Sequence, residues 1–171
     1  MTEIVKKTLF LCLLCLCVIA QSQQTKLRVA VLDPTTSGLA MDDGTKLAVQ
    51  ELISSAFVNT GKYSIIERSM IDKIIKEQSF QSSDMADNSQ ATEIGKLAGA
   101  NKIVLSAVSL VGGRNMLSIK IIDVKTASID KQKARLVAST ELLDIVEALT
   151  LELLGEKPIN EKKNSKKVNA N

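Results

Sequence analysis

Three aspartates in the first third of the chain are the residues best suited to metal chemistry. Asp33 ends an apolar run and precedes Pro34, and Asp42 and Asp43 follow after a short loop. Carboxylate oxygens are the ligands that hard divalent cations prefer, and open α/β sheets place ligands at the carboxyl ends of parallel strands. A small metal- or nucleotide-dependent enzyme is therefore one hypothesis. The alternative is local structure, because Asp is common before Pro and at helix starts.

Two groups of charged residues are candidates for binding a partner. Glu67 and Arg68 lie where an apolar run passes into a helix, and Arg suits planar, bidentate recognition. Their alternative role is to tie this corner together. Lys131, Lys133 and Arg135 alternate along the sequence, so they share one face of a strand. They form either a basic face for an acidic partner, glycan phosphate or lipid head groups, or a row that discourages further strand pairing.

Residues 1–20 have the layout of a secretory signal peptide. Two lysines precede an apolar run from Leu9 to Ile19, and small Ala20 comes before polar Gln21. Such a segment is removed during export, and its apolar run is shorter than the about 20 residues needed to span a bilayer. We predict cleavage after Ala20. The alternatives are a lipid anchor on one of the cysteines and an uncleaved helix.

The cysteines limit the chemistry that the chain can perform. Cys12, Cys15 and Cys17 all lie in the apolar run, and the sequence has no His and no Trp. After cleavage the chain has no disulfide framework, no zinc site of the usual kind and no nucleophile–His triad. We therefore expect no catalytic centre, cofactor or resident metal. In the lipoprotein alternative, Cys15 or Cys17 carries the acyl chains.

The charge of the chain is concentrated at its ends. The net charge is +3, and residues 156–171 contribute five lysines against two glutamates. The part between the leader and this tail is close to neutral, so the charge gives no support for nucleic-acid binding. The tail has no apolar periodicity, which predicts a disordered basic segment.

Apolar periodicity predicts an alternating series of strands and helices between these ends. The strands are expected at 27–32, 63–67, 102–110, 115–124 and 128–138. Helices are expected at 42–59, within 89–99 and at 140–154, and a further helix is expected to begin at a capping arrangement formed by Ser69 and Asp72. The side chains expected to face the core from the helices are Ala48, Val49, Leu52, Ile53, Ala56, Ile71, Ile74, Ile75, Ala91, Ile94, Leu97, Ala98, Leu142, Leu143, Val146, Leu149 and Leu153.

The order β-α-β-α-α-β-β-β-α predicts an α/β fold. The first strand, helix and second strand form a βαβ unit with parallel strands. The last three strands are joined by short turns at Gly112-Gly113 and Lys125-Thr126, so they are antiparallel. A single mixed sheet flanked by helices buries all these apolar faces. The polar stretch between the second and third helices is expected to be a loop.

Five short motifs, in this order and spacing, resemble the CsgG domain family, to which the LpoB-like activators are similar. The motifs are Glu67-Arg68, Glu77-Gln78, Ile94-Gly95-Lys96, Gly99-Ala100 and Asp123-Val124-Lys125-Thr126. The resemblance extends over residues 27–155, which we interpret as one CsgG/LpoB-like domain. It implies that Glu67, Arg68, Glu77 and Gln78 belong to the family signature and are candidates for partner binding. Where the family commonly has Gly after the last motif, this chain has Ala127.

The resemblance also implies a function. The family suggests a non-catalytic periplasmic domain in cell-envelope biogenesis, of the penicillin-binding-protein-activator or curli-assembly type, that acts by protein contact. The expected partners are a cell-wall synthase, a secretion component or a second copy of the chain, and membrane contact is expected only if the chain is lipidated or uncleaved. The sequence has no spare segment for the long insertions of a secretion pore. The expected location is the periplasm, with outer-membrane association in the lipidated case.

Overall fold

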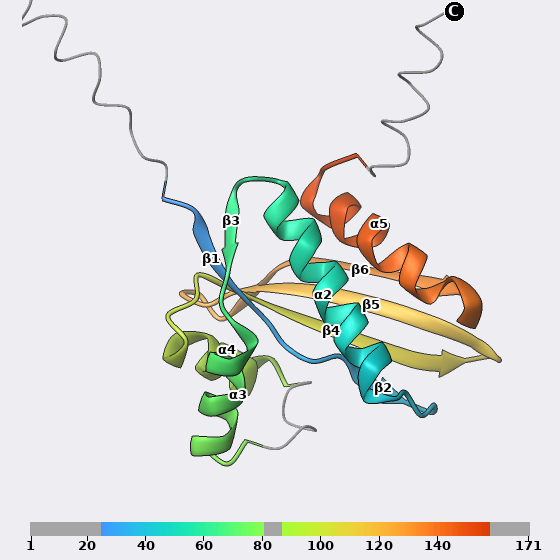
Figure 1. Ribbon diagram of the computed structural model, residues 1–171, viewed down its shortest axis with the longest axis horizontal. Helices are drawn as coiled ribbons and strands as arrows, with labels where there is room; N and C mark the ends of the chain where they lie inside the picture. The colour runs from blue at the N-terminus through green and yellow to red at the C-terminus, as the bar shows by residue number, and fades with distance from the viewer. Residues whose placement is uncertain (1–24, 81–86, 158–171) are drawn as a thin grey trace, which may run out of the picture.

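The computed structural model describes residues 25–80 and 87–157, and these form one mixed sheet with helices on both faces (Figure 1). The elements are β1 (Leu27–Val31), β2 (Thr35–Ser37), α2 (Asp43–Asn59), β3 (Tyr63–Ile65), α3 (Arg68–Glu77), α4 (Asn88–Leu97), β4 (Lys102–Val111), β5 (Arg114–Asp123), β6 (Ser128–Val137), the 3-10 turn η2 (Ser139–Glu141) and α5 (Leu142–Leu154). The predicted signal peptide, with its three cysteines, and the end of the chain from 158, where the disordered tail was predicted, lie outside the described residues.

The sheet has the order β3-β1-β4-β5-β6, with β2 paired to β4. β1 pairs in parallel with both β3 and β4, which confirms the predicted parallel βαβ unit. β4, β5 and β6 are antiparallel neighbours, as their short turns predicted. The predicted α/β fold with one mixed sheet is therefore confirmed, and β3 and β6 form its two edges.

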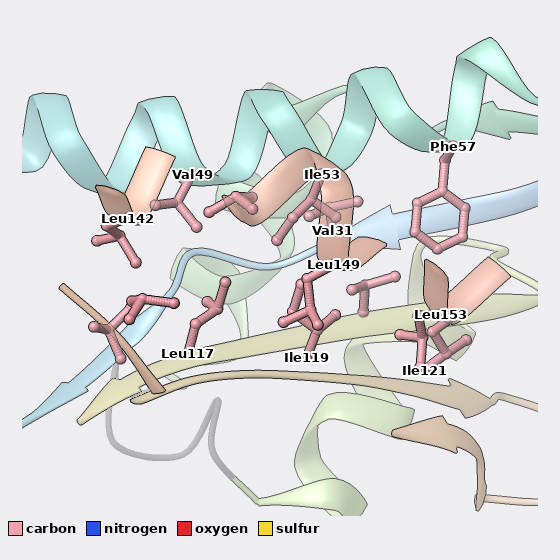
Figure 2. Close-up of a cluster of buried hydrophobic side chains, with 14 of the residues drawn as sticks. Val31, Val49, Ile53, Phe57, Leu117, Ile119, Ile121, Leu142, Leu149 and Leu153 are labelled. Atoms are coloured by element: carbon pink, nitrogen blue, oxygen red, sulfur yellow. The ribbon is translucent and has the colours of Figure 1, made fainter. Parts of the chain in front are cut away.

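One face of the sheet packs against α2 and α5. Val29 and Val31 of β1 point toward these helices and belong to the larger apolar core (Figure 2). Leu117, Ile119 and Ile121 of β5 belong to the same core. Phe57, near the end of α2, is fully buried in this core, and its ring meets the Tyr63 ring edge-on at a centroid distance of 5.0 Å. α2 is thereby fixed over β1 and β3.

The opposite face packs against α3 and α4. Ala30 and Leu32 of β1 contact a second apolar cluster that includes Ile71 of α3 and Ile94 of α4. Gly95 allows α4 to approach the sheet closely, because a Cβ at this position would lie only 2.8 Å from Val124 Cγ2. The family motif Ile94-Gly95-Lys96 therefore has a packing role.

Three predictions about local structure are wrong. The predicted strands omit β2, because its three polar residues give no apolar period. Ser69 does not cap α3: the N-cap is Glu67, without a side-chain cap bond, and Asp72 pairs with Arg68 instead. Leu97 and Leu143 are 50% and 42% exposed. Successive helical residues are rotated by about 100°, which places each of these leucines off the stripe formed by its buried neighbours.

Candidate functional site

The three aspartates that suggested a metal site have separate local partners. Asp42 caps α2, accepting hydrogen bonds from the Thr45 backbone N–H at 2.9 Å and its hydroxyl at 2.6 Å. These bonds lower the pKa of Asp42. Asp43 pairs with Lys46 at 3.2 Å. Within residues 25–80 and 87–157, no group of three or more His, Cys, Asp or Glu side chains could hold a metal ion. The described residues thus give no support to the metal-site alternative, and the helix-start interpretation of Asp42 is confirmed.

Arg68 ties the corner between β1 and α3. Its guanidinium donates to Asp33 at 2.9 Å and lies 3.6 Å from Asp72, four residues later on α3. Burial raises the pKa of Asp33, and the Arg68 charge opposes this shift. Arg68 thus has the structural role that the sequence offered as one alternative, although its partners are Asp33 and Asp72 and not Glu67.

The remaining family-signature residues lie at the two ends of α3. The Glu67 side chain is exposed and has no hydrogen-bond or ion-pair partner among the residues described. Glu77 lies 3.8 Å from Lys73, and the Gln78 backbone N–H donates to Ile74 O as part of the helix end. The predicted partner-binding role of Glu67, Glu77 and Gln78 stays a prediction.

The basic row on β6 faces the same side as α5. Lys133 donates to Glu152 at 2.7 Å, and one Arg135 nitrogen donates to both Glu152 oxygens, at 2.8 and 3.1 Å. The Lys133 bond is the main reason that the pKa of Glu152 is lowered. Two of the three residues thus fasten α5 to the edge strand. Lys131 is exposed, opposite Ile121, and the expected basic interaction face stays a prediction.

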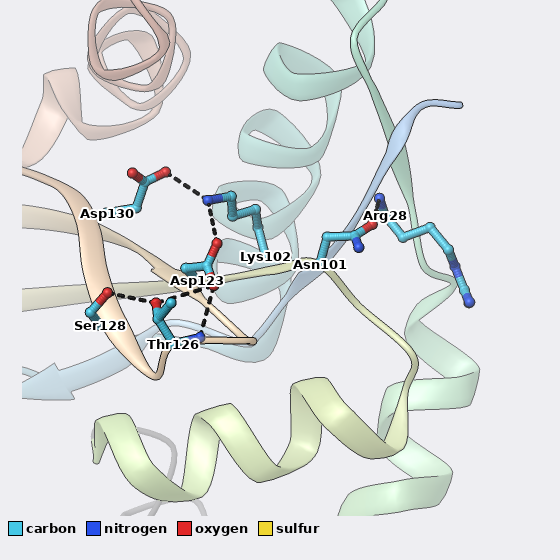
Figure 3. A network of polar contacts seen from close by, with 7 residues as sticks. All are labelled: Arg28, Asn101, Lys102, Asp123, Thr126, Ser128 and Asp130. Carbon is cyan, nitrogen blue, oxygen red and sulfur yellow. Dashed lines mark hydrogen bonds and ion pairs between the residues drawn. The ribbon is translucent and has the colours of Figure 1, made fainter. Parts of the chain in front are cut away.

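The family motif at Asp123 organises a polar network around the β5–β6 turn (Figure 3). Lys102 at the start of β4 donates to Asp123 at 2.9 Å and to Asp130 at 3.0 Å. The other Asp123 oxygen accepts from the Thr126 backbone N–H at 2.9 Å. The Thr126 hydroxyl is 2.7 Å from that of Ser128. The motif therefore closes the turn and ties it to β4.

Asp123 is expected to make stability depend on pH. The hydrogen bond from Lys102, followed by that from the Thr126 N–H, lowers the pKa of Asp123 to about 2. A carboxyl whose pKa falls on folding stabilises the protein above its unfolded pKa, and this contribution is lost as the pH falls toward the folded pKa. Asp123→Asn should therefore lower the free energy of unfolding at pH 7, measured by urea denaturation. The difference from the wild type should shrink between pH 4 and pH 2; an unchanged difference would contradict this assignment.

Ala127 is expected to be a mildly strained position. Its φ is +56°, in the left-handed region that glycine enters at little cost, and this is where the family commonly has Gly. A left-handed conformation costs an L-residue about 1–2 kcal/mol. Ala127→Gly should therefore raise the free energy of unfolding by up to about 1 kcal/mol, measured by urea denaturation. Lys125→Gly, at a position without positive φ, should lower it.

A pocket that the sequence did not reveal lies where α2, β3 and the start of α3 meet. It has a volume of about 440 Å³, and its wall includes Gln50, Glu51, Ile65 and Glu67. Gln50 is 4% exposed and donates to Val31 O at 2.8 Å. The available signal was a polar residue between Val49 and Ile53 on the buried stripe of α2.

The structure resembles several solved bacterial domains. The LpoB C-terminal domain from Salmonella enterica is 16% identical, with a TM-score of 0.56 over 70% of this chain and 88% of that one. Its counterpart from Escherichia coli has a TM-score of 0.54 at the same identity and coverage. Lipoprotein GNA1162 from Neisseria meningitidis is 9% identical, with a TM-score of 0.54 over 75% of this chain and 96% of that one. At these identities the likeness shows a common fold.

Three further findings concern membrane spans, curated relatives and family membership. Within the described residues, no helix has the length and apolar character to cross a membrane. A search of curated proteins found no match. The family model for the curli production assembly/transport component CsgG matches residues 18–112, which reach the β4–β5 turn. This is more than half of the sequence, and the chain therefore belongs to the CsgG family.

Proposed function

We propose that this chain is a non-catalytic, periplasmic protein-interaction domain in cell-envelope biogenesis. The observation that carries the proposal is the family match over residues 18–112. The fold shared with the LpoB C-terminal domains supports it, because it extends the likeness beyond the residues that the family model covers. In this proposal residues 1–20 are a signal peptide, 27–155 the interaction domain, and 156–171 a basic tail.

The polar chemistry of the described residues is consistent with a protein that works by contact. Carboxylates with lowered pKa values are helix caps, turn bonds or ion pairs: Asp42 and Asp87 cap helices, Asp123 closes a turn, and Glu152 holds α5. Shifted pKa values mark functional sites only when the shift serves chemistry in a cleft. Here each of these four carboxylates has a structural partner.

The finer proposal concerns the partner. We infer a cell-wall synthase or a secretion component, as in the penicillin-binding-protein-activator and curli-assembly types, or a second copy of the chain.

The experiment is a pull-down from crosslinked envelopes with the native full-length chain, and intact mass is measured on the same sample. We expect the intact mass of a chain that starts at Gln21. We also expect an envelope protein to be enriched relative to a control pull-down with an unrelated exported protein that carries the same tag. A mass that includes acyl chains on Cys15 or Cys17 would show that the protein is a lipoprotein and that cleavage does not occur after Ala20. The interaction proposal fails if no envelope protein or second copy is enriched while a divalent metal or nucleotide raises the melting temperature.

A further inference from the structure

The open edge of β3 has backbone N–H and C=O groups that do not face β1. β3 is the outermost strand on its side of the sheet. Lys62 O accepts from Leu27 N at 3.2 Å and Ile66 N donates to Val29 O at 2.9 Å, so residues 62 and 66 direct these groups toward β1. Successive residues of a strand alternate in this direction. Tyr63 and Ile65 therefore direct their N–H and C=O groups toward the open edge, where another strand can pair.

A pocket lies on each side of this edge. The pocket of about 440 Å³ is on the α2 side, and a second of about 620 Å³ is on the α3 side, beside Arg28 and Met70. Ile65, Ile66, Glu67 and Ser69 line both, so this segment is a wall between them. The atoms that line the second pocket are mostly apolar, although Arg28 and Lys73 also belong to its wall, and Met70 is 48% exposed beside it.

Several hydrogen-bond acceptors in the wall of the α2-side pocket receive no hydrogen bond from the residues described. Among the residues described, the carboxylates of Glu51 and Glu67 have no hydrogen-bond or ion-pair partner, and Oε1 of the buried Gln50 accepts no hydrogen bond. Arg68, the cation in the wall, already pairs with Asp33 and Asp72. The pocket therefore suits a cationic group with several N–H donors, such as a Lys ammonium or an Arg guanidinium.

We propose that the β3 edge binds an extended segment of a partner protein by strand addition, with a Lys or Arg side chain of that segment in the Glu51–Glu67 pocket. Successive side chains of a strand point to opposite faces. A residue next to the cation would therefore enter the apolar pocket beside Met70. Backbone pairing supplies affinity and the two pockets supply selectivity. This inference rests on the proposed function and names the chemistry of its partner.

The test uses the full chain labelled with ¹⁵N and two blocked pentapeptides, Thr-Leu-Lys-Leu-Thr and the same sequence with norleucine in place of Lys. The Lys peptide is expected to shift the backbone amide signals of Tyr63, Ile65 and Glu67. The norleucine peptide should bind at least about tenfold more weakly. Glu51→Gln/Glu67→Gln should weaken the Lys peptide by a similar factor. The control Glu93→Gln/Glu141→Gln, which removes the same charge at exposed sites elsewhere, should not.

Several results would overturn the inference. Equal binding of the norleucine peptide would show that the acidic pocket is not used, and equal binding of a Lys peptide with N-methylated backbone amides would exclude strand addition. If removal of residues 158–171 shifts the same three amides before any peptide is added, the chain's own tail occupies the edge.

If Glu51→Gln/Glu67→Gln still enriches the same envelope proteins, this inference fails while the proposed function stands. Peptide binding without any enriched protein would leave the edge site standing and remove the proposed function.

Discussion

Replacing Phe57 by Ala is expected to lower the free energy of unfolding by about 3–5 kcal/mol. Phe57 is fully buried and is among the largest fully buried side chains in the described residues. The change removes its apolar burial, leaves a cavity beneath α2, and removes the edge contact with Tyr63. Urea denaturation followed by circular dichroism gives the difference directly.

Val58→Ala is the matched control for Phe57→Ala. Val58 is the next residue on α2 and is 50% exposed, so its truncation should change the free energy of unfolding by about 0.5 kcal/mol or less. A loss below about 1 kcal/mol for Phe57→Ala would mean that α2 does not pack on the sheet as Figure 2 shows.

Replacing Gly95 by Ala is expected to destabilise the protein although Ala is the better helix former. The new Cβ would lie 2.8 Å from Val124 Cγ2 and 3.6 Å from Ile103 Cβ. Val124 is buried and, being β-branched, has little rotamer freedom to move away. Overpacking of this kind costs about 1–3 kcal/mol, while the helix propensity gained is about 1 kcal/mol. We expect a net loss of up to about 2 kcal/mol from these two terms in urea denaturation.

A double-mutant cycle separates the clash from other effects of Gly95→Ala. Val124→Ala alone should destabilise the protein because it removes buried methyl groups. It also clears the space that the new methyl group on α4 would need, so the double variant should lose less stability than the sum of the two single changes, by about 1 kcal/mol or more. Additive losses would show that α4 does not meet Val124, the residue after β5, at this point.

Apolar periodicity was sufficient to predict most of the fold. The strand at 27–32 has apolar residues on both faces, which indicated burial between two helical layers, and both β1 faces are indeed buried from Val29 onward. β2 escaped prediction because it is defined by pairing with β4, some 70 residues away, and not by its own composition. Leu97 and Leu143 were wrongly assigned to the core because their apolar character was given more weight than their angular position around the helix.

The candidate sites were harder to predict because they depend on contacts between distant segments. Arg68 meets Asp33, 35 positions earlier, and Arg135 meets Glu152, 17 positions later. The sequence showed which residues are charged but not which charges neutralise each other. The pocket of about 440 Å³ combines side chains of α2 with residues 65–69, and the pocket of about 620 Å³ combines Arg28 of β1 with the same segment and α3. A spacing rule within one element cannot reveal such combinations.

The position of β1 between β3 and β4 has a consequence for the timing of folding. Val29 pairs with Ile65 on one side and with Lys102 on the other. In contrast, β4 pairs with β5 and β5 with β6, the next strand in each case. Contacts close in sequence form with less loss of loop entropy. In a chain that emerges amino-terminus first, β1 therefore appears long before its β4 partner. Val29 of β1 can pair with Ile65 of β3 earlier, but it has no β4 partner until Lys102 has followed.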